Sequence, residues 1–376
     1  MPLLTLLQLT FGILAGPWIT DMSETGFSVL WTTSSPTMGR VILSDGCAER
    51  EFVQKVSGRA VTSCFHRVDV SGLEPGGRYS YRIRGKELVN FDNPYVGVYT
   101  EEHDFTPSLP VRTFDRNAEE CTFSVVNDMH FQAGRYHDLC SRIDTEEEDF
   151  LLLCGDIVSY ANDIDTVMHY FFNPVSEVVS RIPVVFCRGN HETKGADTRF
   201  LPKLFPTPTG ELYYSFRVGP VAFVVLDNGG KTPDSDPSYG GDAYYDEYRA
   251  EELEWLKGAL NEESFRSARY KVAVVHMPFH GDAKGSYAQK EMSRTYMPVL
   301  GAGGIDLMLC GHQHVHNHYA PGEVLSTLPD GSTATNSFPI ITNSNTERLK
   351  FHADPSGITV ETYALSDSLT HRYVIR

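Results

Sequence analysis

Seven side chains with oxygen or nitrogen donor atoms follow apolar runs at five places in this chain. They are Asp128, His130, Asp156, Asn190, His276, His312 and His314. Each run is typical of a buried strand, and ligands of α/β sheets gather at the carboxyl ends of strands. Asp128 and His130 are two residues apart, as are His312 and His314, and an extended chain places such residues on the same side. The spacing therefore predicts one cluster of carboxylate, amide and imidazole groups.

The donor set predicts a centre of two metal ions. Seven oxygen and nitrogen donors are too many for one tetrahedral zinc ion, and no Cys-x-x-Cys spacing occurs in the chain. Two ions roughly 3.5–4 Å apart can hold both oxygens of an in-line displacement at phosphorus. Each of these residues alone is more often an ordinary turn residue. The ordered series of five strand ends is what indicates function.

The stretch from Arg188 to Glu192 carries the densest group of polar side chains. Gly189 lets the backbone turn without strain from a Cβ atom. Asn190 offers an amide oxygen to a metal, and the imidazole of His191 titrates near neutral pH. We expect His191 to bind a phosphate oxygen or to protonate the leaving group, with Glu192 holding its other ring nitrogen. The alternative for Glu192 is an ordinary surface residue.

Further residues are candidates for contacts with a substrate. The predicted contacts are Asn190, His191, His280, Lys231, Arg188 and Arg199. His280 lies four residues after His276, and its alternative is an ordinary loop residue. The long polar loop 228–241 is of the kind that often forms a lid or rim. We expect His316 and His318 to support the ligands or to be solvated.

Composition places the chain among ordinary globular proteins. Its 376 residues suit two domains, and 41% hydrophobic with 22% charged residues allow a sizeable core. The net charge of -17 argues against a broad nucleic-acid surface, but it allows a phosphorylated substrate because bound cations reverse the local field. No apolar run of about eighteen residues appears, so no membrane span is expected. The sequence leaves the oligomeric state open.

The N-terminus allows two interpretations. The apolar segment 3–15 is similar to the core of a secretion signal, yet no Lys or Arg precedes it and no clear cleavage site follows before Gly16. We favour a first β-strand over residues 11–20 and leave residues 1–10 undecided. Of the seven cysteines, we expect those within apolar runs to be buried free thiols. Cys47 and Cys64 are candidates for a disulfide if the protein is exported.

Two patterns of predicted elements divide the chain. Residues 16–114 form short alternating strands between turn signals such as 34–36, which is typical of an all-β sandwich. After the charged connector 115–120, strands alternate with helices, which predicts an α/β domain. Predicted strands cover 27–32, 39–43, 65–70, 78–83, 122–127, 150–154, 184–187, 221–226, 270–275 and 305–310, and strands return within 338–375. Predicted helices cover 134–147, 164–181 with an interruption at Pro174, 247–260 and 289–300.

The segment from Val70 to Tyr81 resembles the Gly-Leu-x-Pro-Gly-x-x-Tyr-x-Tyr turn of fibronectin type III domains. The resemblance implies that Leu73 plugs the core and that the two tyrosines pack between sheets. This part of the chain holds no catalytic constellation. We therefore predict a fibronectin type III-like β-sandwich over residues 1–115, with a structural or substrate-framing role.

The five blocks Asp-x-His, Gly-Asp, Gly-Asn-His-Glu, His and Gly-His-x-His, over residues 122–315, resemble the calcineurin-like metallophosphoesterase superfamily. A fibronectin-like domain ahead of them is similar to the arrangement in purple acid phosphatases. The resemblance implies a four-layer αββα sandwich over residues 120–376 and two metal ions, with Fe, Zn or Mn as the candidates. One ion would be held by Asp128, His130, Asp156 and His314, and the other by Asp156, Asn190, His276 and His312.

The first two blocks depart from the purple acid phosphatases. That family carries Asp-x-Gly in the first block and a metal-bound tyrosine three residues after the second aspartate. Here His130 stands in place of the glycine, and Tyr160 lies four residues after Asp156. The departure argues against a tyrosinate-bound iron site.

These expectations together predict a phosphoesterase. It would hydrolyse a small phosphorylated substrate, monoester or diester, by in-line attack of a hydroxide that bridges the two ions. The domain arrangement favours an extracytoplasmic location, either periplasmic or secreted. The competing interpretation is a non-catalytic adhesive surface protein that binds through its fibronectin-like domain, and the intact ligand set argues against it. A β-lactamase-type metallohydrolase is disfavoured because His-x-His-x-Asp-His is absent.

Overall fold

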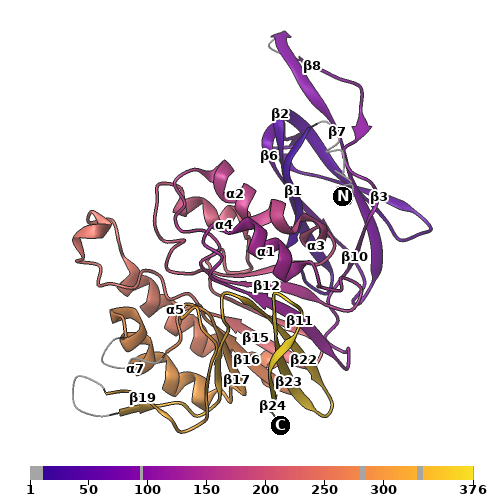
Figure 1. The fold of residues 1–376 in the computed structure, drawn as a ribbon. Coiled ribbons are helices and arrows are strands. Elements are labelled where there is room, and N and C mark those ends of the chain that lie inside the picture. The colour runs from indigo at the N-terminus through magenta and orange to yellow at the C-terminus, as the bar shows by residue number, and fades with distance from the viewer. Residues whose placement is uncertain (1–11, 94–95, 280–284, 328–332, 376) are drawn as a thin grey trace. The chain divides into compact units, whose positions relative to one another are not determined.

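The computed structural model describes residues 12–93, 96–279, 285–327 and 333–375 (Figure 1). The chain divides into two compact units, residues 1–114 with 175–183 and residues 115–174 with 184–376. The sequence did not predict that segment 175–183 belongs to the first unit, where α3 (Ser176–Val179) packs on β1 (Ile13–Thr20). The undecided residues 1–10 lie outside the described residues.

The first unit is built around one long strand, β2 (Gly26–Ser44). Its first part pairs with β1 and β6 (Ser63–Ser71), and its second part pairs with β3 (Glu49–Val53) and β7 (Arg78–Asn93). The prediction of a turn at 34–36 is wrong, because the strand continues through an irregular register between Thr32 and Thr37. The other strands of this unit are β4 (Lys55–Val56), β5 (Arg59–Ala60), β8 (Val96–Tyr99), β9 (His103–Asp104) and β10 (Leu109–Arg112).

Aromatic side chains fill the interior of the first unit. Trp31 and Tyr81 are fully buried, and the Trp31 ring stacks on His66 with the ring centroids 4.7 Å apart. Leu73 is buried, as its fibronectin-like turn implied, and the Tyr81 hydroxyl donates to Ser180 O at 2.8 Å. Each such ring removes on the order of 150–250 Å² from water. The aromatic core is therefore a large part of what stabilises this β-rich unit.

Two six-stranded sheets form the second unit. Their strand orders are β13-β12-β11-β22-β23-β24 and β14-β15-β16-β17-β21-β18. The first sheet contains β11 (Cys121–Val126), β12 (Phe150–Cys154), β13 (Val184–Cys187), β22 (Glu347–Asp354), β23 (Gly357–Ala364) and β24 (Leu369–Ile375). The second contains β14 (Tyr214–Val218), β15 (Val221–Val225), β16 (Tyr270–Val274), β17 (Leu307–Cys310), β18 (Asn317–Tyr319) and β21 (Ile340–Thr342), while β19 (Val324–Thr327) and β20 (Thr333–Thr335) pair separately.

Phenylalanine side chains join the two sheets, and helices cover their outer faces. The rings of Phe123 and Phe150 in the first sheet lie 5.5 Å and 5.6 Å from that of Phe223 in the second. Beside the first sheet lie α1 (Ala133–Cys140) and α2 (Ile164–Phe172). The outer face of the second sheet packs on α5 (Tyr245–Ala259) and α7 (Tyr287–Ala302) (Figure 1). The predicted αββα sandwich is confirmed.

One predicted helix is shorter than expected. Helix α1 ends at Cys140 and not at Glu147, because the Asp144 side chain accepts a hydrogen bond from Glu146 N at 2.9 Å and closes a turn. The interruption predicted at Pro174 is present as the 3₁₀ turn η1 (Asn173–Val175). The remaining helical segments are η2 (Thr198–Phe200), α4 (Leu201–Leu204), η3 (Pro237–Tyr239) and α6 (Glu263–Arg266).

Two further findings concern cysteines and membrane spans. All seven cysteines are free thiols, and Cys47 and Cys64 are both exposed, so the candidate disulfide is not formed in this structure. Among the described residues, no helix has both the length and the apolar character that crossing a membrane requires.

Candidate metal centre

The strand ends identified in the sequence lie at the carboxyl edges of the two sheets. In order, β11, β12, β13, β16 and β17 lead into Asp128, Asp156, Asn190, His276 and His312. The strands β11, β12 and β13 are parallel, as are β16 and β17, so each set ends at a common edge. This arrangement brings distant parts of the chain together, since His130 Nε2 lies 3.2 Å from His314 Nε2.

The donor atoms form groups that share neighbours. One group contains Asp128, His130 and His314, a second contains Asp156, His276 and His312, and a third contains His130, Asp156 and His191, with the donor atoms in each within 4.8 Å of one another. His276 Nε2 lies 3.2 Å from Asp156 Oδ2 and 3.9 Å from Asp128 Oδ1, so it faces both carboxylates. The members of the first two groups each belong to one of the two predicted ligand sets, whereas the third group joins His191, which was not predicted as a ligand, to His130 and Asp156. Which atoms bind an ion stays a prediction.

Each aspartate uses one oxygen within the protein and turns the other toward the imidazoles. Asp128 Oδ2 accepts a hydrogen bond from His312 N at 2.7 Å, whereas Asp128 Oδ1 lies 3.2 Å from His314 Nε2. Asp156 Oδ1 accepts from His191 N at 2.8 Å. These backbone hydrogen bonds fix both carboxylates, and one oxygen of each is left for a ligand.

Oxygen atoms of the chain also fix the imidazole rings. His276 is fully buried, and its Nδ1 lies 2.7 Å from Cys154 O. His191 Nδ1 lies 2.9 Å from Ser159 O, and Ser159 Oγ lies 3.3 Å from His130 Nδ1. A carbonyl oxygen only accepts a hydrogen bond, so we assign a proton to Nδ1 of His276 and of His191. With Nδ1 bonded to the backbone, Nε2 of each ring points toward the site. Ser159 was not among the predicted site residues, because its position in a strand-end loop was its only signal in the sequence.

Buried polar atoms that lack a hydrogen bond of good geometry make this site suitable for cations. Asp128 Oδ1, Asn190 Oδ1 and His276 Nε2 are buried and form no hydrogen bond of good geometry among the described residues, although Asp128 Oδ1 lies 3.2 Å from His314 Nε2 and His276 Nε2 lies 3.2 Å from Asp156 Oδ2. One unpaired buried polar atom costs about 1–3 kcal/mol. Metal ions would satisfy these atoms, and a set of carboxylate, amide and imidazole donors suits Zn, Mn or Fe.

The charges of the site also favour cations. Burial opposes the ionisation of Asp128, but the hydrogen bond with His314 and the charge of His276 outweigh it and hold its pKa below the usual value. Burial is also outweighed at His276, where the Asp156 carboxylate raises the pKa well above its usual value, so without a metal the ring keeps a proton that a bound ion would have to displace. Burial, followed by the charge of His276, lowers the pKa of His312 to about 4. His312 is therefore neutral at pH 7, which is the form that binds metals.

The backbone at the candidate ligands is strained. Nine described residues other than glycine have positive φ, and five of them are candidate ligands: Asp128 (56°), His130 (46°), Asp156 (56°), His312 (72°) and His314 (61°). Left-handed backbone costs such residues roughly 1–3 kcal/mol each and is concentrated at functional sites. The expectation that an extended chain aligns the paired donors is therefore wrong, because tight left-handed turns aim them.

Glu192 holds two loops together and does not orient His191. Its Oε2 accepts from Asp156 N at 2.8 Å and from Gly189 N at 3.0 Å, and its Oε1 accepts from Val158 N at 3.2 Å. The side chain is fully buried, so it is not a surface residue either. The packing is close, because a Cβ atom on Gly189 would collide with Asp156 Oδ1. Since β12 and β13 are neighbours, the carboxylate lies beneath both loops, and the predicted contact with the His191 ring is wrong.

Glu192→Gln is expected to lower the free energy of unfolding by about 1–3 kcal/mol, because the new amide NH₂ meets backbone N–H donors. Metal affinity should fall about 10–100-fold, because the loops that carry Asp156 and Asn190 lose their support. Thermal unfolding and metal analysis measure both effects, with the exposed Glu177→Gln as the control. If the Glu192→Gln protein unfolds normally and binds metal normally but turns over slowly, the result would instead support the predicted contact between Glu192 and His191.

The other candidates for substrate contact differ in their surroundings. Arg188 Nη2 pairs with Asp227 Oδ2 at 2.8 Å, and Arg199 Nη2 pairs with Asp242 Oδ2 at 2.6 Å. Both guanidinium groups are thus already neutralised by a carboxylate. Lys231 is exposed and has no ion pair within the described part of the chain.

Four remaining sequence candidates lie in different places. Tyr160 is half exposed, and His280 lies outside the described residues. The His316 ring stacks on His371 with centroids 3.9 Å apart and an interplanar angle of 8°. Glu347 completes a group with them, with donor atoms within 4.8 Å of one another, but the parallel ring planes aim the two imidazole lone pairs side by side and not at one ion. His318 is exposed, which agrees with the expectation that it is solvated and not with the alternative that it supports the ligands.

Comparison with known proteins gives consistent matches. The family model for calcineurin-like phosphoesterase matches residues 122–316. Purple acid phosphatase 21 of Arabidopsis thaliana is 24% identical over 290 residues, which cover 71% of this chain and 58% of that protein. Serine/threonine-protein phosphatase CPPED1 of Bos taurus is 25% identical over 189 residues, which cover 44% of this chain and 53% of that protein. The chain therefore spans little more than half the length of these curated relatives.

Solved structures support the same fold. The purple acid phosphatase PPD1 from yellow lupin (Lupinus luteus) has a TM-score of 0.63 at 13% identity, covering 96% of this chain and 73% of that chain. The structure of PhoD has a TM-score of 0.62 at 11% identity, covering 100% of this chain and 90% of that chain.

Proposed function

The chain belongs to the calcineurin-like phosphoesterase family, and we propose that it hydrolyses phosphate esters at a centre of two metal ions. The observation that carries this proposal is the set of buried donor atoms that lack a hydrogen bond of good geometry, Asp128 Oδ1, Asn190 Oδ1 and His276 Nε2. They come from three different strand ends of the second unit. A protein that only binds or adheres has no need of such a set, so the adhesive alternative is not adopted.

The proposed ligands follow the two donor groups. One ion is assigned to Asp128, His130, Asp156 and His314, and the other to Asp156, Asn190, His276 and His312. When bound, two such ions lower the pKa of a shared water and neutralise charge on the phosphoryl oxygens. Fe, Zn and Mn are the candidate metals, and the substrate is a small phosphorylated molecule. The proposed location is extracytoplasmic, as the domain arrangement suggests.

His191 is proposed to act on the phosphate and its leaving oxygen. Its Nδ1–H donates to Ser159 O, so its Nε2 is directed away from that loop. The His191 and His130 ring centroids are 4.7 Å apart, which places His191 beside the candidate ligands. In the protonated form, Nε2–H donates to a phosphoryl oxygen or transfers its proton to the leaving oxygen.

Protein stripped of metal and reloaded with Mn, Zn, Fe or Mg is expected to hydrolyse 4-nitrophenyl phosphate or bis(4-nitrophenyl) phosphate with at least one metal. A chelator should remove this activity, because the ions would supply the activated water that attacks phosphorus. Rates on the two esters, measured side by side, decide between monoester and diester. Asp156→Asn purified in parallel measures contaminating phosphatase. Folded, metal-loaded protein that is inert on both esters would overturn the proposal.

A further inference from the structure

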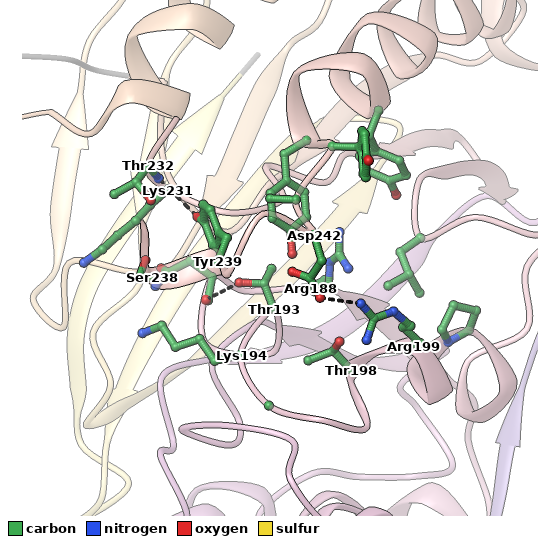
Figure 2. A pocket seen from close by; sticks show the side chains of 18 of the residues that line it. Arg188, Thr193, Lys194, Thr198, Arg199, Lys231, Thr232, Ser238, Tyr239 and Asp242 are labelled. Atoms are coloured by element: carbon green, nitrogen blue, oxygen red, sulfur yellow. Dashed lines mark hydrogen bonds and ion pairs between the residues drawn. The ribbon is translucent and has the colours of Figure 1, made fainter. Parts of the chain in front are cut away.

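A pocket of about 640 Å³ opens beside the proposed metal centre, entirely within the second unit (Figure 2). One wall contains Asn190, Thr193 and Lys194, which belong to the loop that follows β13. The loop before α5 and the start of that helix supply another wall, with the tyrosines at 239, 244, 245 and 248. The pocket is therefore continuous with a candidate metal ligand and is flanked by aromatic rings.

The cationic side chains of this pocket fall into two classes. Arg188 and Arg199 each face a carboxylate, and Figure 2 shows the pair that Arg199 forms with Asp242. Lys194 and Lys231 have no ion pair among the residues that the structure describes. The positive charge that remains for a ligand is therefore that of the two lysines.

Glu211 is the one other acidic side chain among the described residues that line the pocket. Burial raises its pKa, and its carboxylate offsets part of the positive charge of the two lysines.

The two lysines line the same pocket, and one of them contacts His191. Lys194 Nζ is 3.3 Å from His191 Nε2. Burial and then the charge of Lys231 lower the pKa of Lys194. Both lysine side chains extend to the same side of the pocket in Figure 2. Like charges held together repel each other, and a bound anion relieves that repulsion.

We propose that Lys194 and Lys231 bind a second anionic group, a phosphate or a carboxylate, on the leaving group of the substrate. This inference rests on the proposed function. Water adds to phosphorus, the ester P–O bond breaks, and the leaving alcohol takes up a proton and retains its anionic group. The tyrosine rings suit a compact apolar segment between the ester oxygen and that group. The substrate class is therefore a phosphate monoester with a second negative charge close to the first.

Three aryl esters test this inference: phenyl phosphate, 4-carboxyphenyl phosphate and 1,4-phenylene bisphosphate. The protein is expected to prefer one or both of the charged esters over phenyl phosphate by about 10–100-fold in kcat/KM. Lys231→Met should remove most of that preference, because methionine keeps the length and loses the charge. Lys194→Met should reduce the preference and also slow all three reactions, because Lys194 contacts His191. Lys257→Met, an exposed change on α5 outside the pocket, is the control and should retain the preference.

Non-hydrolysable phosphonates give the same comparison at equilibrium. Calorimetry should show 1,4-phenylenediphosphonate binding about 10–100-fold more tightly than phenylphosphonate, and Lys231→Met should abolish the difference. If only the bisphosphate is preferred, the second group that the lysines bind is a phosphate. If the carboxylate ester is preferred equally, the lysines accept either anion. Hydrolysis without a preference, or with one that survives both lysine changes, overturns this inference alone. If the protein hydrolyses bis(4-nitrophenyl) phosphate but none of the three monoesters, this inference is overturned and the proposed function stands. Protein that hydrolyses neither the diester nor any of the monoesters overturns the proposed function.

Discussion

Asp156→Asn is expected to release both metal ions together and to lower kcat/KM by about 10²–10³-fold or more. Asp156 Oδ2 lies 3.2 Å from His276 Nε2 and 3.9 Å from His130 Nε2, so this carboxylate faces both donor groups. Its other oxygen accepts from His191 N. Asparagine keeps the shape but removes a buried charge, and loss of one partner in a buried charged set costs about 3–5 kcal/mol. Metal analysis and steady-state rates measure the two effects.

Two matched variants make the Asp156 result specific. Asp138 is exposed on α1, and Asp138→Asn should retain two ions and full activity. His314 belongs to only one donor group, so His314→Ala should retain about one ion per chain. Thermal unfolding of all three variants shows whether each is folded. Two ions retained by Asp156→Asn would contradict the bridging role.

His191→Ala is expected to retain both ions while the rate falls about 10²–10⁴-fold, the range of general acid catalysis. The ring is held by Ser159 O through Nδ1, and its backbone N–H, which alanine keeps, donates to Asp156 Oδ1. The substitution therefore removes the imidazole and leaves the carboxylate in place. Metal content and kcat on one ester measure the outcome, with the exposed His169→Ala as the control.

The leaving group separates the two roles proposed for His191. 4-Nitrophenolate departs without a proton, whereas phenolate departs more readily when protonated. If His191 protonates the leaving oxygen, His191→Ala should slow phenyl phosphate far more than 4-nitrophenyl phosphate. Equal losses on the two esters would instead indicate a contact with a phosphoryl oxygen. Loss of an ion from His191→Ala would make His191 a ligand.

Much of the fold was predictable because its signals are local. Apolar runs of strand length, polar residues at their ends and proline at 174 are read within a few residues, and these predictions hold. The failures lie where packing overrides local signals. Ser34-Ser35-Pro36 reads as a turn, yet β2 continues through it because strands on both sides pair with it. Likewise, α1 stops at a side-chain turn made by Asp144, which helix periodicity does not reveal.

The sequence by itself determined which donor types are present and that each follows a strand. Only the tertiary structure decided how those donors are held. Glu192 Oε2 accepts from Asp156 N, 36 residues away, and His312 N donates to Asp128 Oδ2 across 184 residues. Such contacts depend on which strands become neighbours, and no local pattern records that. For the same reason the sequence did not point to Ser159 or Lys194, and it offered Lys231 without Lys194. These residues become informative only when separate loops meet at one sheet edge.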